Sequence, residues 1–518
     1  MLFVCLFHGL GALGLVGPDE PRYAAIARSM AETGDWVTPK LWGSPWLEKP
    51  ILYYWTAASA MRLFGATEFA ARFPSALAAL LAVFAAAWAS LRCYGARAAW
   101  CVLLMLPASV AMIGFARGAG PDMLFAATLT AAMAAAMEIL QTPRPGWLAR
   151  CLFGFFAGAA VLAKGPAAVI LAAGALALWA LAAGRMDGLW RFLHPLVILA
   201  WSVTALPWYI LCALRNPDFL RIFIWEHNFQ RFLTPVFEHR QPFWFFAVIL
   251  LLAMLPWTWI CLVSLDRWRD RGRQREQQAG SWRDSPDLFL SCWAGFIVVF
   301  FSISQSKLPG YILPAIPALF ALIGRQVAWA DENGRPMLRW AVVATGAMFL
   351  LAAVRVARPV LALVTPWDSP AFLGMLGAAT AGLLGGVTLL WLGWRKHLLP
   401  SVVTVSALAA ILVLIFNLGI VPVADHVVSS RSVARDVIAR AQSGQAVFHY
   451  KLPRAWGYGL EYYGGGPAQQ WNTDRAGPAW IVTTVQAAQQ LREAGIEIRE
   501  ARREQGSPIM ILRVGPEK

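Results

Sequence analysis

The chain has 518 residues, of which 58% are hydrophobic and only 14% are charged. Soluble globular proteins contain about 25% charged residues, so this composition excludes a soluble enzyme, a disordered protein and a fibrous protein. The 44 Lys and Arg outnumber the 29 Asp and Glu, which gives a formal net charge of +15. Because these charges lie in short loops between apolar runs, they indicate contact with anionic membrane lipids and no nucleic-acid partner.

Thirteen apolar runs follow one another along residues 1–424, and each is a candidate membrane-spanning helix. The first run is short and no basic residue precedes it, so it fits a first helix better than a signal peptide. Residues 51–64 are a further helix candidate, too short and too aromatic for a span. We therefore predict an all-α polytopic membrane domain. Its runs lie near residues 1–16, 71–92, 97–115, 122–140, 147–163, 165–183, 191–213, 242–264, 286–304, 309–330, 337–358, 371–394 and 399–421.

The basic residues predict the orientation of these spans. The loop 265–285 contains six Arg, and loops rich in Lys and Arg face the cytoplasm. Every other loop on that side then holds at least two Lys or Arg. Residues 17–70, residues 214–241 and the C-terminal tail fall on the opposite side of the membrane.

The tail, residues 425–518, is polar and differs from the rest of the chain. It is predicted to form a small α/β domain outside the bilayer, and no catalytic motif is visible in it. Residues 432–442 and 485–495 have the periodicity of amphipathic helices, whereas residues 445–452, 478–485 and 508–515 are typical of strands.

The loop 17–50 begins with an acidic pair, Asp19 and Glu20, followed by Pro21. Proline is favoured in the first turn of a helix, and negative charge is favoured at a helix N-terminus. The pattern therefore predicts a helix near residues 21–33 with both carboxylates at its start. The local sequence leaves two interpretations of Asp19 open, an N-cap residue and a functional carboxylate.

The loop 214–241 contains two histidines, His227 and His239, each directly after a Glu. Two histidines and a carboxylate form a common zinc site. Because the histidines are 12 residues apart with Pro235 between them, such ligands would come from two segments. The alternative is a pair of interfacial histidines among Trp and Phe side chains, and the local sequence leaves both open.

Ionisable residues also lie at the ends of predicted spans, where they are costly unless they have a function. Lys164 and Lys307 are long enough to reach the interface, but Asp122 is not. Together with the two loops, these residues give one face of the membrane both cations and carboxylates. Clustered cations suit a phosphate group, and carboxylates suit a base or a metal. We therefore predict a lipid substrate with a phosphate-linked headgroup, whose tail lies among the spans.

Seven motifs between about residues 15 and 320 resemble those of the ArnT-type glycosyltransferases. These are bacterial members of the GT-C class and relatives of protein O-mannosyltransferases. The resemblance implies transfer of 4-amino-4-deoxy-L-arabinose from undecaprenyl phosphate to a lipid A phosphate, at the periplasmic side of the bacterial inner membrane. It also implies thirteen transmembrane helices and a periplasmic domain. The motifs are PDEPRYA, GDWVTPKLWGSPWLEKPILYYW, PDMLF, AKGP, EHNFQRF, EHRQPFWFF and SKLPGYILP.

The resemblance implies roles for individual residues as well. Asp19 corresponds to the acidic residue of the first periplasmic loop and Asp122 to a second acid of the cavity, and we predict both as catalytic residues. Glu48, His227 and His239 correspond to ligands of a divalent metal, zinc by preference, which we expect to be structural. The residues predicted to bind the carrier phosphate or the sugar are Arg22, Tyr23, Lys49, Lys164, Lys307 and Tyr311.

The predicted mechanism is a single inverting displacement at the anomeric carbon, in which cations stabilise the departing polyprenyl phosphate. Asp19 serves as general base if the acceptor is a hydroxyl, and orients the substrates if the acceptor is a phosphate. A glycosyltransferase acting on proteins or cell-wall glycans would use the same residues. A transporter or flippase of polyprenyl-linked sugars would place its charges near the bilayer midplane, whereas these charges gather on one face.

Overall fold

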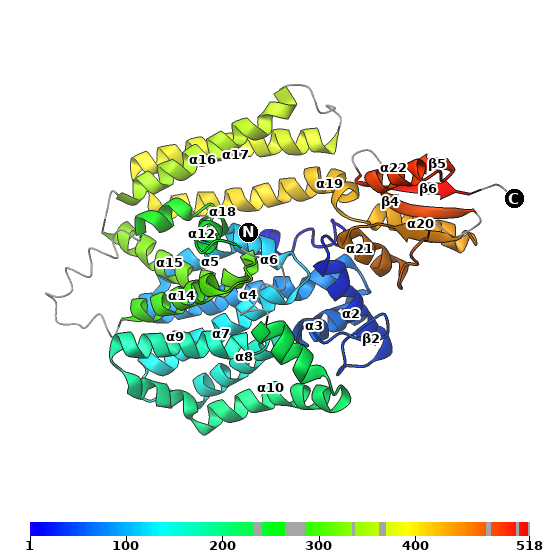
Figure 1. The fold of residues 1–518 in the computed structure, drawn as a ribbon. Coiled ribbons are helices and arrows are strands. Elements are labelled where there is room, and N and C mark those ends of the chain that lie inside the picture. The colour runs from blue at the N-terminus through cyan, green and yellow to red at the C-terminus, as the bar shows by residue number, and fades with distance from the viewer. Residues whose placement is uncertain are drawn as a thin grey trace.

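Figure 1 shows the computed structural model, a bundle of long helices with a small α/β domain at one end. The structure describes residues 1–230, 241–264, 285–333, 337–361, 369–472, 478–503 and 507–515. This architecture confirms the predicted fold class, an all-α membrane domain followed by a small α/β domain.

The elements of residues 1–230 include a short hairpin, β1 and β2, between the helices α2 and α3. They are α1 (Leu2–Leu6), α2 (Asp19–Thr33), β1 (Lys40–Leu41), β2 (Ser44–Pro45), α3 (Leu52–Phe64), α4 (Glu68–Tyr94), α5 (Ala96–Met105), η1 (Leu106–Ala108), α6 (Val110–Ala116), α7 (Pro121–Gln141), α8 (Trp147–Lys164), α9 (Ala167–Ala183), η2 (Met186–Leu193), α10 (Pro195–Arg215) and η3 (Arg221–Gln230).

The remaining elements complete the bundle and build the C-terminal domain. They are α12 (Phe245–Ala253), α14 (Pro286–Ile303), η5 (Pro309–Ala315), α15 (Ile316–Glu332), α16 (Met337–Leu361), α17 (Pro370–Arg395), α18 (Leu398–Ile415), η6 (Phe416–Ile420), α19 (Val421–Val428), α20 (Arg431–Gln442), β3 (Val447–Tyr450), α21 (Arg454–Gly464), β4 (Ala479–Thr484), α22 (Val485–Glu493), β5 (Ile498–Arg502) and β6 (Ile509–Val514).

The predicted count of thirteen spans is not confirmed. Nine helices of the described residues are long and apolar enough to cross a membrane, or eleven if each of two bent helix pairs is one span. The bent pairs are Ala96–Ala108 with Val110–Ala116, and Phe245–Ala253 with Thr258–Ser264. Helix α9 is shorter than the other spans, and the predicted first run contains only the five-residue α1 as helix.

The break in the first bent pair has a local cause. The hydroxyl of Ser109 donates to the carbonyl of Leu106 at 2.7 Å and accepts from the amide of Met112 at 3.3 Å. Ser109 therefore ends one helical segment and caps the next, α6. The sequence pattern of apolar residues continues through this point, so hydropathy predicted one straight span over 97–115.

The C-terminal domain has a four-stranded sheet in the order β3-β4-β6-β5, in which β3 and β4 are parallel and the other pairs antiparallel. The predicted strands match β3, β4 and β6, and the predicted helices match α20 and α22. Successive residues of β4 point to opposite faces. Ile481 packs with Leu491 of α22 on one face, and Val482 packs with Leu460 of α21 on the other. Helices on both faces explain why β4 is buried along nearly its whole length.

Helices α2 and α3, strand β2 and the C-terminal domain lie at the same end of the bundle (Figure 1). Helix α3 confirms the helix predicted at residues 51–64, and it is not among the candidate spans. The predicted polar loop 17–70 thus brings its side chains to the end of the bundle where α7 begins and α8 ends.

Candidate functional site

The start of α2 is fixed by a buried ion pair between Glu20 and Arg72 of α4. Arg72 donates to both carboxylate oxygens of Glu20, at 3.1 and 2.7 Å. The Glu20 side chain is 11% exposed, and the Arg72 side chain is 4% exposed. Its other three N–H groups donate to backbone carbonyls, so all five donors of the guanidinium are used. Those carbonyls belong to Leu10, Leu13 and Gly14. The ion pair therefore fixes the chain that enters α2.

Asp19 lies next to Glu20 but points the other way. Its side chain is 62% exposed and accepts a hydrogen bond from Arg22 Nη2 at 2.6 Å. Pro18 occupies the N-cap position of α2, so Asp19 is the first helical residue and not the N-cap. Asp19 is thus a carboxylate presented to solvent and held by one cation.

Arg22 lies within a group of aromatic rings. Its guanidinium carbon is 5.2 Å from the ring centroids of both Tyr23 and Trp46, and 5.7 Å from that of Tyr458 in the C-terminal domain. Burial acts against the charged form of Arg22, but the neighbouring Tyr23, Asp19 and Glu48 outweigh it and raise the pKa of Arg22. Arg22 is therefore a permanent, partly desolvated cation beside Asp19.

A second ion pair joins the start of α7 to the end of α8. Lys164 Nζ donates to Asp122 Oδ1, and the same Nζ lies 4.9 Å from the ring centroid of Tyr311. Gly310, in η5, is packed against this pair, because a Cβ added there would lie 3.0 Å from Asp122 Oδ2. The structure thus brings together three predicted site residues that lie far apart in the sequence.

Tyr23 lies between the two charged groups. Its pKa is raised by burial first, then by the negative charge of Asp19 and, to a smaller extent, by that of Asp122, whereas Arg22 opposes the rise. The Tyr23 ring also lies 3.8 Å from the Cβ position of Gly120, two residues before Asp122. Asp19 and Asp122 therefore belong to one polar region centred on Tyr23.

Glu48 and His227 also come together, with 3.9 Å between Glu48 Oε1 and His227 Nε2. Two zinc ligands in tetrahedral geometry lie roughly 3.4 Å apart, so this spacing is close to that of a shared ion. Within the residues that the structure describes, no group of three His, Cys, Asp or Glu could hold a metal ion. The third predicted ligand, His239, lies outside the described residues, and Lys49 is half-buried beside Glu48.

Lys307 does not join these groups through any described contact. The residue is 7% exposed, and its Nζ donates to the carbonyl of Ser304 at 2.6 Å. This bond closes the turn between α14 and η5. The structure therefore gives Lys307 a local structural contact, which its position at a span end did not predict.

An apolar pocket of about 300 Å³ adjoins the Asp122–Lys164 pair. It lies between α6, α12 and η5, and its lining includes Phe115, Ile249, Leu252 and Pro309. A Cβ added to Gly310 would lie 2.8 Å from the Phe115 ring and 3.0 Å from Asp122 Oδ2, so the pocket and the charged pair are neighbours. A larger cavity of about 440 Å³ contains Gln141 in its lining, at the opposite end of α7, and is distant from this site.

Comparison with known proteins places this geometry in a family. The sequence model of the family described as dolichyl-phosphate-mannose-protein mannosyltransferase matches residues 11–223. An undecaprenyl phosphate-alpha-4-amino-4-deoxy-L-arabinose arabinosyl transferase of Sodalis glossinidius is 32% identical to this chain, over 75% of the chain and 71% of the relative. The chain belongs to this family of ArnT-type transferases.

Another ArnT-type relative, from Edwardsiella ictaluri, is 33% identical over 68% of this chain, and the matched region spans 61% of that relative. The crystal structure of ArnT from Cupriavidus metallidurans bound to undecaprenyl phosphate superposes with a TM-score of 0.80 at 25% identity, and covers 100% of this chain and 98% of that protein. The apo form of the same protein superposes with a TM-score of 0.77. The ArnT-type fold therefore extends over the whole chain.

Several residues of the candidate site could not be identified from the sequence. Arg72 was counted as part of an apolar run, although an Arg inside a span is costly unless it is bonded, and that cost was the available signal. Trp46 lies within a motif that gives it no role of its own. Tyr458 lies in the C-terminal domain, and no local pattern connects it to Arg22. Such contacts depend on tertiary structure.

Proposed function

We propose that this protein transfers 4-amino-4-deoxy-L-arabinose from undecaprenyl phosphate to a lipid A phosphate. The observation that carries the proposal is the juxtaposition of two cation–carboxylate pairs, Arg22–Asp19 and Lys164–Asp122, beside an apolar pocket. Cations suit the carrier phosphate, and an apolar pocket suits an isoprenoid tail. Membership of the ArnT-type family supports the same assignment.

In this proposal the donor headgroup lies between the two pairs. Arg22 and Lys164, with Lys49 and Tyr311 as further donors, stabilise the negative charge that develops on the departing phosphate. Asp122 orients Lys164 through their ion pair. Tyr23 is buried between them and excludes water from one side.

The carboxylate of Asp19 is exposed, so an acceptor substrate can reach it. A lipid A phosphate is already largely ionised near neutral pH, so Asp19 would orient the acceptor or the sugar amine and would not need to remove a proton. For a hydroxyl acceptor Asp19 would act as general base. Either reaction inverts the anomeric carbon, because the acceptor oxygen attacks opposite the carrier oxygen as the bond to the carrier breaks.

The proposed location of this chemistry is the periplasmic side of the bacterial inner membrane. The loop 265–285 with its six Arg supports a cytoplasmic position for the opposite end. Helices α2 and α3 and the C-terminal domain would then all lie in the periplasm (Figure 1).

We further propose that zinc links the two periplasmic loops through Glu48, His227 and His239. When bound, the ion would have a structural role, because it would connect the segment after β2 to η3. Metal content of the purified protein, measured by inductively coupled plasma mass spectrometry, tests this. Near-stoichiometric zinc in the wild type and its loss in His227→Gln would support the site, whereas equal zinc in both proteins would contradict it.

Mass spectrometry of lipid A from host cells with and without the gene tests the proposed function. Loss of a pentosamine-sized mass from lipid A upon deletion is expected. Unchanged lipid A, with the protein expressed in the wild type, would contradict lipid A as acceptor. The match of residues 11–223 to protein mannosyltransferases favours a protein hydroxyl as the second candidate, and glycoproteomics of the same two strains would detect it.

A further inference from the structure

Helix α21 belongs to the C-terminal domain but packs against the membrane domain as well. Leu460 lies in the core of the C-terminal domain, whereas Tyr462, 2% exposed, lies in the core of the membrane domain. The hydroxyl of Tyr462 donates to the carbonyl of Ala66 at 3.2 Å, and Arg28 of α2 donates to the carbonyl of Tyr462 at 3.2 Å. The helix is therefore fixed on both sides.

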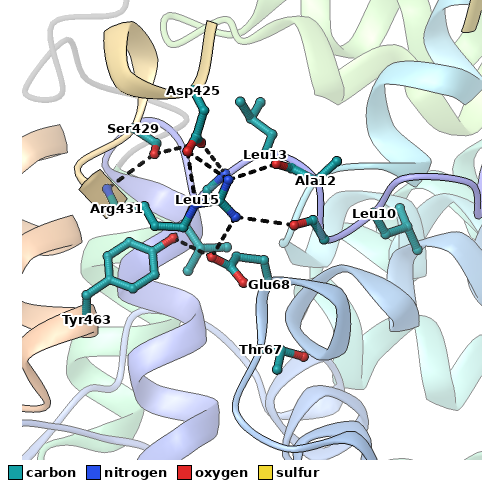
Figure 2. A network of polar contacts seen from close by, with 12 residues as sticks. Leu10, Ala12, Leu13, Leu15, Thr67, Glu68, Asp425, Ser429, Arg431 and Tyr463 are labelled. Carbon is teal, nitrogen blue, oxygen red and sulfur yellow. Dashed lines mark hydrogen bonds and ion pairs between the residues drawn. The ribbon is translucent and has the colours of Figure 1, made fainter. Parts of the chain in front are cut away.

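A polar network fixes the same helix to the N-terminal segment, as Figure 2 shows. Tyr463 donates to Glu68 at 3.0 Å and accepts from the amide of Leu15 at 3.0 Å. Arg431 pairs with Asp425 at 2.7 Å and with Glu68 at 3.3 Å. This network holds α21 in a defined position over the start of α2.

From this position α21 directs Tyr458 at Arg22, one of the residues of the proposed site. The guanidinium of Arg22 donates from Nη2 to Asp19, and its buried Nε has no hydrogen-bond partner among the described residues. Its orientation therefore depends on the rings of Tyr23, Trp46 and Tyr458. Of these, only Tyr458 comes from the C-terminal domain.

The same helix contacts the hairpin that precedes Glu48. Glu461 accepts a hydrogen bond from Trp42 Nε1 at 3.2 Å. Trp42 has a φ of +51° in the β1–β2 turn, a conformation that a bulky residue adopts only when its surroundings fix it. Trp46 follows directly after β2, so the contact of α21 with this hairpin also supports Trp46. Helix α21 therefore supports two aromatic neighbours of Arg22, Tyr458 and Trp46.

We propose that Tyr458 is a positioning residue for carrier binding, through which the C-terminal domain orients the guanidinium of Arg22 toward the carrier phosphate. The inference rests on the proposed function, because it takes Arg22 as a phosphate ligand. It assigns the C-terminal domain a part in binding the donor, although that domain contains no catalytic motif.

The test is the affinity of purified full-length protein in detergent for undecaprenyl phosphate. Tyr458→Leu should weaken binding about three- to tenfold, the loss expected for one cation–π contact, and Tyr458→Phe should bind as the wild type does. Tyr450→Leu is the matched control: Tyr450 also lies in the C-terminal domain and under a cation, Lys451 at 5.3 Å, but it packs on Trp471. It should bind normally.

A double-mutant cycle with Arg22→Ala separates positioning from a general structural effect. If Tyr458 acts through Arg22, Tyr458→Leu causes no further loss of affinity in the Arg22→Ala background. Equal loss in both backgrounds, wild-type affinity of Tyr458→Leu, or a loss in Tyr458→Phe would each overturn the inference. Failure of the wild-type protein itself to bind undecaprenyl phosphate would instead contradict the proposed function, and the inference with it.

Discussion

Arg72 and Glu20 form a buried, two-point ion pair, with hydrogen bonds of 3.1 and 2.7 Å between the guanidinium and the carboxylate. Glu20 also accepts from the amides of Val16, at 2.8 Å, and Ala119, at 2.7 Å. This pair therefore connects α4, the start of α2 and the segment that leads into α7. It is the contact on which the positions of both Asp19 and Asp122 depend.

Glu20→Gln should strongly destabilise the protein, because it leaves the buried charge of Arg72 without a counter-charge. Removing one partner of a buried ion pair costs about 3–5 kcal/mol in the free energy of unfolding. The control is Glu32→Gln, whose 60% exposed carboxylate pairs with Arg28 on the same helix and should cost less than about 1 kcal/mol. Thermal unfolding in detergent measures both, and equal midpoints for the two variants would contradict the role given to Glu20.

Gly310→Ala should lower the rate of sugar transfer strongly, with only a small change in the free energy of unfolding. The added methyl would displace the ends of two side chains, the Phe115 ring at 2.8 Å and Asp122 Oδ2 at 3.0 Å. Misplacement of a site group by about 1 Å can cost on the order of 100-fold in rate. Gly295→Ala in α14 is the matched control, since no atom lies within 4 Å of its added Cβ. Transfer by Gly310→Ala at the rate of Gly295→Ala would show that the Asp122 pair tolerates displacement.

Glu461 predicts a pH dependence of stability. Burial raises its pKa, and the hydrogen bonds from Trp42 and the Ala468 amide oppose this only in part. The folded state therefore binds the proton more tightly than the unfolded state, whose pKa is about 4.3. As pH rises from that value through the raised folded pKa, the contribution of Glu461 to stability falls.

Glu461→Gln removes this decline and keeps an acceptor for Trp42. The unfolding midpoint of Glu461→Gln should therefore rise relative to that of the wild type as the pH increases from about 4.5 to about 7. Glu493→Gln, at an exposed position of α22, is the control and should follow the wild type throughout. A constant difference between Glu461→Gln and the wild type over this range would contradict the assignment.

Much of this architecture follows from local properties of the sequence, and the exceptions have physical causes. Apolar runs located the membrane helices, but the break at Ser109 depends on a side-chain cap that hydropathy does not register. The strand β5 was missed because it is an edge strand with mostly polar residues. Helix α21 was missed because three glycines oppose helix formation. Packing requires one of them, since a Cβ at Gly459 would lie 1.9 Å from Ser430 Oγ.

In the candidate site, too, some residues could be predicted from local sequence and others only from tertiary structure. Motifs identified Asp19, Arg22, Asp122 and Lys164, and the structure gathers these two pairs around Tyr23. The supporting residue Tyr458 is more than 400 positions from Arg22, so its contact could only be found in three dimensions. The contact of Lys307 was likewise found only in three dimensions, because its position at a span end gave no sign of its bond to the carbonyl of Ser304.

The most direct test of this account is transfer of aminoarabinose from undecaprenyl phosphate to lipid A by purified Asp19→Asn protein. The matched control is Asp218→Asn, because Asp218 is 69% exposed and pairs with Arg221 three residues on, as Asp19 pairs with Arg22. We predict that Asp19→Asn loses at least about 100-fold in transfer while folding normally, and that Asp218→Asn retains wild-type transfer. Near wild-type transfer by Asp19→Asn would contradict the central claim that this carboxylate organises the reaction.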